Sequence, residues 1–256
     1  MRRLLPACLA LLSGPVGALA PSGLAHPSPV HRSPGTPVAT SRTRYVLGYS
    51  VEHRPIIAWL IAPKRARRSV LVVGTIAGDE PGGIAVARVL SSQAAIAGVR
   101  LWLVPDANPD GVARGARTNA DGVDLNRNFP FRWRRLGAPG NRFYSGPRPA
   151  SEPETEAIEM FLRRTRPGLA IWLHQPYGLI DDSQGPRWAE QQLARALELP
   201  LRRLPDYPGS AIGWDDHIVP ASAFDLELPG GRLSRATVFR TVSAIRALAR
   251  RFAVAR

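Results

Sequence analysis

The chain has 256 residues and a formal net charge of +14, with 45% hydrophobic and 21% charged residues. This length suits one large α/β domain, and the composition lies in the ordinary globular range, which excludes a wholly disordered chain or a coiled coil. A single cysteine excludes an intramolecular disulfide framework and a cysteine-based zinc cluster. Lys64 is the only lysine, so the charge comes almost entirely from scattered arginines, which indicates a compositional bias more than a nucleic-acid surface.

The N-terminal residues have the pattern of an export signal. Two arginines precede an apolar run over residues 4–12, and small residues at positions 18 and 20 form a cleavage site. The run is too short to span a membrane, which takes roughly 20 apolar residues. We therefore expect residues 1–20 to be a signal peptide of an extracellular, periplasmic or cell-wall-associated protein, with no transmembrane segment after cleavage. An uncleaved N-terminal anchor is the alternative.

The rest of the chain divides into a linker and one domain. Residues 21–40 are rich in proline, serine, alanine and glycine, a composition that does not pack into a core. No internal repeat and no second linker follow. We therefore expect residues 41–256 to form a single domain.

Strand-like and helix-like patterns alternate along this domain. Short apolar or β-rich runs bounded by turn residues predict strands, and longer runs with helical spacing or a capped acidic start predict helices. The predicted strands are residues 45–50, 56–61, 70–73, 100–104, 169–173 and 224–228. The predicted helices are residues 82–97, 151–165, 187–197 and 234–253. The first two strands form a hairpin, and the alternation that follows predicts an α/β fold with a mixed, largely parallel sheet covered by helices on both faces.

Polar residues gather just beyond these predicted strands. Asp79 and Glu80 follow the strand at 70–73, His174 directly follows the strand at 169–173, and Glu227 lies at the end of the last strand. In open α/β sheets, ligands bind outside the carboxyl ends of the strands. The sequence therefore predicts an enzyme-like site at this edge.

Seven sequence blocks point to a known family. They are GTIAGDEPGG (74–83), NPDG (108–111), RGARTNADGVDLNRNFP (114–130), YSGPRPASEPET (144–155), WLHQPYG (172–178), YPGSAIGW (207–214) and DLELP (225–229). These blocks resemble those of the zinc metallocarboxypeptidases, particularly their murein-peptide amidase branch. NPDG alone would be weak, but the long GVDLNRNFP and SGPRPASEPET blocks are highly specific. The resemblance covers roughly residues 44–253 and implies a zinc-carboxypeptidase-like α/β/α sandwich.

The resemblance also implies a Zn²⁺ site, but one of its three protein ligands is missing from this sequence. Zinc in that family is held by a histidine and a glutamate three residues apart and by a distant histidine. Glu80 and His174 match two of these ligands, but Ala77 stands where the first histidine belongs. Catalytic zinc normally has three protein ligands, so two would leave a weaker site and make zinc occupancy doubtful.

Three interpretations of this gap remain open. Asp79 or His217 replaces the missing ligand, or catalysis proceeds without a properly ligated metal. In the third interpretation, the protein is a metal-poor pseudoenzyme that still binds the carboxylate end of a peptide.

The other implied site residues are present. Glu227 matches the general base that takes a proton from the attacking water, and Arg114 matches the arginine that polarises the scissile carbonyl. Arg117 is a further substrate-binding candidate. Asn126 and Arg127 match the pair that grips the terminal carboxylate of the substrate, for which the planar fork of arginine is suited.

A mobile tyrosine that closes over the substrate in the family is matched by Tyr207, although its PDYPGSAIGW context could equally be a plain turn. The loops at about 131–143 and 179–186 are the expected walls of the site.

These residues together predict an exported zinc metallocarboxypeptidase-like hydrolase. By resemblance, it cleaves the amide next to a C-terminal or diaminopimelate-type residue, with a peptide or murein peptide as its partner. No nucleic-acid reader motif is present, so nucleic acid is not an expected partner. The sequence does not indicate the oligomeric state.

Overall fold

The computed structural model describes residues 40–182 and 185–255, which lie in one compact unit, Pro37–Arg256. The predicted signal peptide and nearly all of the predicted linker lie outside the described residues. Among the described helices, none combines the length and the apolar character that crossing a membrane requires.

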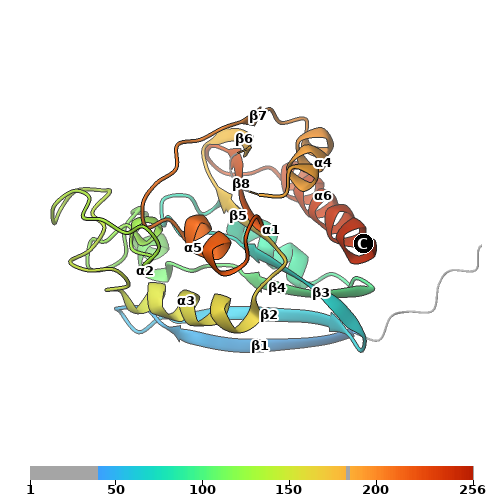
Figure 1. Ribbon diagram of the computed structural model, residues 1–256, viewed down its shortest axis with the longest axis horizontal. Coiled ribbons are helices and arrows are strands. Elements are labelled where there is room, and N and C mark those ends of the chain that lie inside the picture. The colour runs from blue at the N-terminus through green and yellow to red at the C-terminus, as the bar shows by residue number, and fades with distance from the viewer. Residues whose placement is uncertain (1–39, 183–184, 256) are drawn as a thin grey trace, which may run out of the picture. The chain divides into compact units, whose positions relative to one another are not determined.

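Eight strands form one sheet, and its central strands are parallel (Figure 1). The strands are β1 (Thr40–Tyr49), β2 (Pro55–Pro63), β3 (Ala66–Val73), β4 (Gly98–Val104), β5 (Leu169–His174), β6 (Tyr177–Asp181), β7 (Leu201–Arg202) and β8 (Ala223–Pro229). Their order in the sheet is β1-β2-β4-β3-β5-β8-β6-β7. Strands β4, β3, β5 and β8 run parallel, whereas β1–β2, β2–β4 and β6–β8 are antiparallel pairs. The predicted mixed, largely parallel sheet is confirmed.

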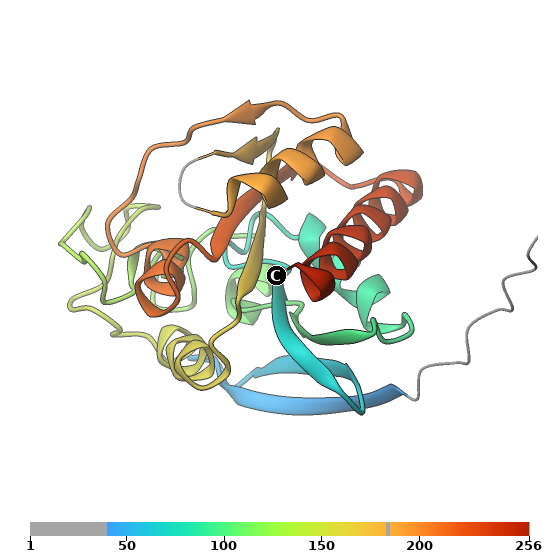
Figure 2. The same ribbon diagram turned by 45° about the vertical axis from the view of Figure 1, so that its right-hand side comes forward.

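Helices cover both faces of this sheet (Figure 2). They are α1 (Gly82–Ser91), α2 (Pro109–Arg114), the 3-10 helix η1 (Leu125–Arg127), α3 (Pro153–Thr165), α4 (Arg187–Leu197), α5 (Ala211–Ile218) and α6 (Arg235–Val254). Successive side chains of a strand point to opposite faces. Val70 and Val72 of β3 accordingly pack in one core with α1, α4 and α6. Leu71 and Val73 pack in the other core with α3 and α5.

The predicted hairpin, buried strands and helices are all present, with some differences in length. The helix predicted over residues 82–97 ends at Ser91. The hydroxyls of Ser91 and Ser92 donate hydrogen bonds to the carbonyls of Arg88 and Val89, which competes with continuation of the helix. Part of the loop expected at 179–186 is instead strand β6, which pairs with β8. The short elements α2, η1, α5, β6 and β7 had not been predicted.

Candidate functional site

The carboxyl ends of three neighbouring parallel strands bring the predicted polar residues together. Glu80 lies in the segment between β3 and α1, His174 is the last residue of β5, and Glu227 lies beside it on β8 in the sheet register. All three line a cavity of about 460 Å³. The structure therefore gathers these three residues at the edge of the sheet that the sequence indicated.

Glu80 accepts hydrogen bonds on both of its carboxylate oxygens. Oε1 accepts from Arg117 Nη1 at 2.9 Å, and Oε2 lies 2.8 Å from His174 Nδ1 and 3.1 Å from the backbone nitrogen of Gln175. Burial alone would raise the pKa of Glu80, but the hydrogen bond with His174 and the charges of His174 and Arg117 outweigh it. The pKa of Glu80 therefore lies below its ordinary value, and the group is a fixed anion.

His174 is surrounded by carboxylates. Its Nε2 lies 3.5 Å from Asp225 Oδ1, while its Nδ1 faces Glu80. Burial opposes a charge on the imidazole, but Asp225, Glu80 and Glu227 raise the pKa of His174 to about 9. Burial raises the pKa of Asp225 itself to about 7. This carboxylate cage favours a positive charge at the imidazole, whether a proton or a bound cation supplies it.

The donor atoms near Glu80 and His174 do not complete a catalytic zinc site. The described residues hold no group of three or more His, Cys, Asp or Glu side chains arranged for a metal ion. Position 77 is a fully buried alanine, whose methyl group has no donor atom. Two donors from one glutamate and one histidine are fewer than the three that catalytic zinc normally takes.

Neither predicted replacement ligand reaches this pair. Asp79 accepts a hydrogen bond from Arg142 at 3.1 Å and lines a neighbouring cavity instead. His217, on α5, stacks on Phe131 with ring centroids 4.5 Å apart and does not line the cavity. In the described structure, neither Asp79 nor His217 is therefore placed to act as the third zinc ligand in place of the missing histidine.

Glu227 is buried and faces the cavity. Its Oε2 accepts a hydrogen bond of 3.4 Å from the backbone nitrogen of Tyr177. Burial raises the pKa of Glu227 above its ordinary value, against the opposing charge of His174. A carboxylate with a raised pKa accepts a proton more readily near neutral pH, as a general base must.

The two arginines of the RGAR segment have different surroundings, which corrects one sequence prediction. Arg114 ends α2 with a side chain 44% exposed, where it pairs with Glu52 and donates to the carbonyl of Ala120. It does not line the cavity, so it is not positioned to polarise a substrate carbonyl. Arg117 lines the cavity instead, held by Glu80 and by a 2.8 Å bond from its Nε to Asp124 Oδ2.

The same cavity is also lined by Asn126, Arg127 and Tyr207. We call these three residues the clasp. Asn126 Oδ1 accepts a 2.9 Å hydrogen bond from the backbone nitrogen of Ala211, which ties η1 to the start of α5. The Arg127 guanidinium lies 3.9 Å from the centroid of the Tyr207 ring, and its Nη1 donates to the carbonyl of Asn126 at 2.7 Å. The three residues that the resemblance grouped are thus brought together.

Arg127 is a buried cation that forms no ion pair with any described carboxylate. The residue is only 5% exposed, and the charges of Asp124 and Asp225 act on it without direct contact. Burial lowers the pKa of Arg127, which reflects the cost of its charge in this environment. Because buried charges are normally paired, this guanidinium is arranged to receive an anion from the cavity.

Three site residues were not found by sequence reasoning. Asp225 lies two residues before Glu227 on β8, and this i, i+2 spacing, which places both on one face of a strand, was a readable signal. Gln175 and Asp124 gave no such signal, because their partners lie far away along the chain.

A profile of zinc carboxypeptidases matches residues 39–180, more than half of the chain. The chain belongs to the zinc carboxypeptidase family. Murein peptide amidase A of Escherichia coli K12 is 35% identical over 182 residues, which is 65% of this chain and 74% of that protein. The Vibrio campbellii protein of the same name is 29% identical and is covered to 72%. Family membership confirms the expectation of a peptidase-type hydrolase and does not favour the non-catalytic alternative.

Solved structures agree with this membership. Murein-tripeptide amidase MpaA from Escherichia coli O157 superimposes with a TM-score of 0.69 at 28% identity, covering 84% of this chain and 96% of that one. Carboxypeptidase A from Helicoverpa armigera has a TM-score of 0.70 at 21% identity, covering 84% and 69%. The predicted zinc-carboxypeptidase-like fold is confirmed.

Proposed function

We propose that the protein is an exported hydrolase of murein peptides that cleaves the amide next to a C-terminal or diaminopimelate-type residue. The observation that carries this proposal is the buried Arg127 guanidinium, which faces the same cavity as Glu227 and has no carboxylate partner among the described residues. The names of the murein peptide amidase relatives supply the substrate class.

The clasp would hold the terminal carboxylate of the substrate. Arg127 offers parallel N–H donors to two carboxylate oxygens, and Tyr207 packs on the guanidinium face from an exposed position. Asn126 uses its side-chain oxygen to hold α5, which leaves its amide nitrogen as a donor. A peptide that ends in an amide would leave Arg127 without its anion.

Glu227 and Arg117 would act on the amide itself. Glu227 accepts the proton of the water that attacks the carbonyl and later returns it to the leaving amine. Arg117 is fixed at the cavity wall by Asp124 and Glu80, and its positive charge would stabilise the oxyanion that forms during attack.

Zinc is the metal that the family implies, and Glu80 and His174 are the two residues that would hold it. A zinc-activated water would need a third donor, and the described residues do not supply one. We therefore assign no step to the metal.

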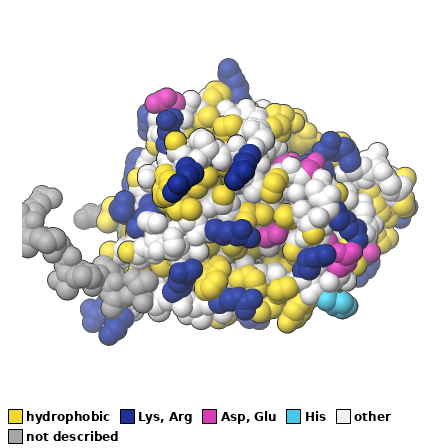
Figure 3. All heavy atoms as spheres, turned by 180° about the vertical axis from the view of Figure 1, so that it is seen from behind, with side chains coloured by type: hydrophobic (Ala, Val, Ile, Leu, Met, Phe, Trp, Pro, Cys, Tyr) yellow, Lys and Arg dark blue, Asp and Glu magenta, His cyan; other side chains and the backbone are white. Residues whose placement is uncertain are grey.

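Export and cell-wall association are part of this proposal. The motivating observations are the signal-like residues 1–20 and the charge of +14. Figure 3 shows Lys and Arg side chains spread over one face with few carboxylates between them. Opposite charge favours encounter with anionic cell-wall material. Mass determination of the N-terminus after expression, together with cell fractionation, tests it: an intact Met1 terminus in the cytosolic fraction would contradict export.

The activity is tested with a murein tripeptide that ends in diaminopimelate. The purified protein is incubated with this peptide and with its C-terminal amide, with and without added zinc, and released products are identified by mass spectrometry. We expect release of the terminal residue from the free acid only. Binding of the acid without cleavage under any metal condition would favour the non-catalytic alternative. Failure to bind the acid would remove the clasp assignment as well.

A further inference from the structure

A second and larger cavity adjoins the site. It has a volume of about 800 Å³ and lies between α1 and the N-terminal part of α6. Glu80, Arg142, Gln175 and Pro176 line both cavities, so the two adjoin along this shared boundary. We call the second cavity the groove. It contains neither the clasp nor Glu227, and the mechanism above does not use it.

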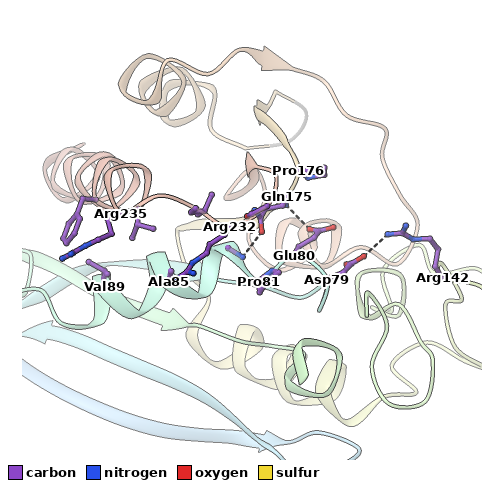
Figure 4. A pocket seen from close by; sticks show the side chains of 15 residues that line it. Asp79, Glu80, Pro81, Ala85, Val89, Arg142, Gln175, Pro176, Arg232 and Arg235 are labelled. Carbon is purple, nitrogen blue, oxygen red and sulfur yellow. Dashed lines mark hydrogen bonds and ion pairs between the residues drawn. The ribbon is translucent and has the colours of Figure 1, made fainter. Parts of the chain in front are cut away.

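The groove leads away from the clasp. Asp79 and Arg142 lie at one end and Val89 and Arg235 at the other, with Glu80 and Gln175 between them (Figure 4). From Gly82 to Val89, α1 rises about 1.5 Å per residue, or roughly 10 Å over seven residues. An extended peptide advances about 3.3 Å per residue, so about three residues fit along this length. A substrate held at its carboxylate end by Arg127 would place the opposite, acyl half here.

Gln175 fixes the two walls of the groove relative to each other. Its Oε1 accepts a 2.8 Å hydrogen bond from the backbone nitrogen of Gly82, at the start of α1. Its Nε2 donates to the carbonyls of Pro229 and Gly231 at 2.6 and 2.8 Å. One side chain thus joins α1 to the segment that precedes Arg232, so the groove is already formed without a ligand.

The charges of the groove are unbalanced. Its two carboxylates are occupied, because Asp79 pairs with Arg142 and Glu80 pairs with Arg117 and His174. Arg232 and Arg235 line the groove along α1, and the described residues give neither of them an ion pair or a side-chain hydrogen bond. The rest of the groove is mainly apolar, with Ala85, Val89, Leu233, Val238 and Phe239.

We propose that the groove binds the acyl half of the substrate and selects one that carries carboxylates, that is, an acidic peptide. This rests on the proposed function for the direction of the substrate. The arginines supply the positive potential that an acidic chain requires, and the apolar surface accommodates its carbon skeleton.

The test compares two N-acetylated pentapeptides with the same C-terminal pair of residues. One carries glutamates among its first three residues and the other carries glutamines at those positions. A short ligand consists of the C-terminal pair alone. Dissociation constants are measured by calorimetry at low and at high salt in the Glu227→Gln background, which prevents turnover.

We expect the acidic peptide to bind about three- to tenfold more tightly than the neutral peptide at low salt, and this preference to shrink at high salt. The double variant Arg232→Gln/Arg235→Gln should lose the preference and keep the affinity for the short ligand. Arg240→Gln is the matched control, because Arg240 is an exposed arginine of α6 that does not line the groove.

Equal binding of the two pentapeptides, or an equal loss in Arg240→Gln, would overturn the proposal. The outcomes also separate it from the proposed function. If the short ligand binds through Arg127 without any acidic preference, the groove assignment alone fails. If the short ligand does not bind but the arginine-dependent preference persists, the clasp assignment fails and the groove assignment holds.

Discussion

The clasp and the centre formed by Glu80, His174 and Glu227 share one cavity but differ in how their charges are balanced. In the clasp, Arg127 is buried and lacks a counterion among the described residues. In the centre, Glu80 is matched by Arg117 and His174, and His174 also faces Asp225. The clasp is therefore prepared for an anion that comes from outside, whereas the centre is largely satisfied by its own residues.

The two parts also depend on different elements. The clasp is built from η1 and the segment before α5, and the centre from the ends of β3, β5 and β8. The two parts are linked through Arg117, which bonds both Glu80 and Asp124, the N-cap of η1. Their chemical roles differ, however, so we expect substitutions at Arg127 and at Glu227 to affect peptide binding and amide cleavage separately. Alanine at position 77 affects the centre and leaves the clasp unchanged, and this separation can be tested from both sides.

The largest expected effect is on cleavage alone. Glu227→Gln removes the general base, so the rate of amide hydrolysis should fall about 10²- to 10⁴-fold while peptide affinity remains within a few-fold. Product release and calorimetry on the same preparation measure the two quantities. Glu156→Gln, an exposed change on α3, is the matched control. Hydrolysis that survives Glu227→Gln would show that another group is the base.

The next effect is on binding. Arg127→Gln removes the charged donor of the clasp, and affinity for a peptide with a free terminal carboxylate should fall about 10- to 100-fold. Affinity for the corresponding peptide amide should change little, because the amide does not use the charge. A titration of both peptides against wild type and variant measures the difference. An equal loss for acid and amide would mean that Arg127 supports the fold and does not recognise the carboxylate.

The zinc affinity of the centre can be tested by adding a third metal-binding side chain. Ala77→His places an imidazole three residues before Glu80, and zinc affinity should rise more than about tenfold, since loss of outer-shell partners alone changes metal affinity about 10- to 100-fold. Metal content after dialysis measures this without relying on activity. Ala77→Leu adds bulk without a donor and is the control. If neither variant gains zinc, the centre departs from a metal site at more than position 77.

The last effect is on stability and concerns α5, whose first residue bonds Asn126 of the clasp. Asp215 is buried on α5, where one carboxylate oxygen accepts a 3.2 Å bond from Trp172 Nε1 and the other has no hydrogen-bond partner in the described chain. Burial raises the pKa of Asp215 to about 7. Between about pH 4 and pH 7 the folded protein then binds more protons here than the unfolded chain, so the free energy of unfolding falls as pH rises.

Asp215→Asn should remove this fall in the free energy of unfolding with rising pH, because asparagine does not ionise. The variant should match wild type near pH 4 and gain roughly 1–3 kcal/mol of stability by about pH 8. Urea unfolding at several pH values measures it, with exposed Asp121→Asn as the control. A constant difference between variant and wild type across this range would show that the Asp215 charge is not the cause.

The sequence predicted the parts of the site that depend on regular strands. Uninterrupted apolar runs located β3 and β5, and the carboxyl ends of parallel strands necessarily meet, so the sequence alone was enough to group Glu80, His174 and Glu227. Strand β6 was missed because it is short and adjoins β5 closely, and β7 has only two residues.

The roles of Arg114 and Arg117 could not be separated from the sequence. They lie three residues apart, and only contacts with distant residues distinguish them. Arg114 forms an ion pair with Glu52 away from the cavity. Arg117 forms ion pairs with Asp124 and Glu80 and lines the cavity. Long-range partners of this kind are decided by tertiary packing, which local patterns do not encode.

The sheet order also bears on self-association. Its outermost strands are β1 and β7, and an unpaired outer strand is a template on which another chain could add a strand. At one edge of the sheet, β7 has only two residues, which are too few to form a stable set of backbone hydrogen bonds with an added strand. At the other, the long β1 carries Arg42 and Arg44, and their like charges would oppose a second copy pairing there. We therefore expect Arg42 and Arg44 to disfavour strand-by-strand association of copies at the longer of the two outer strands.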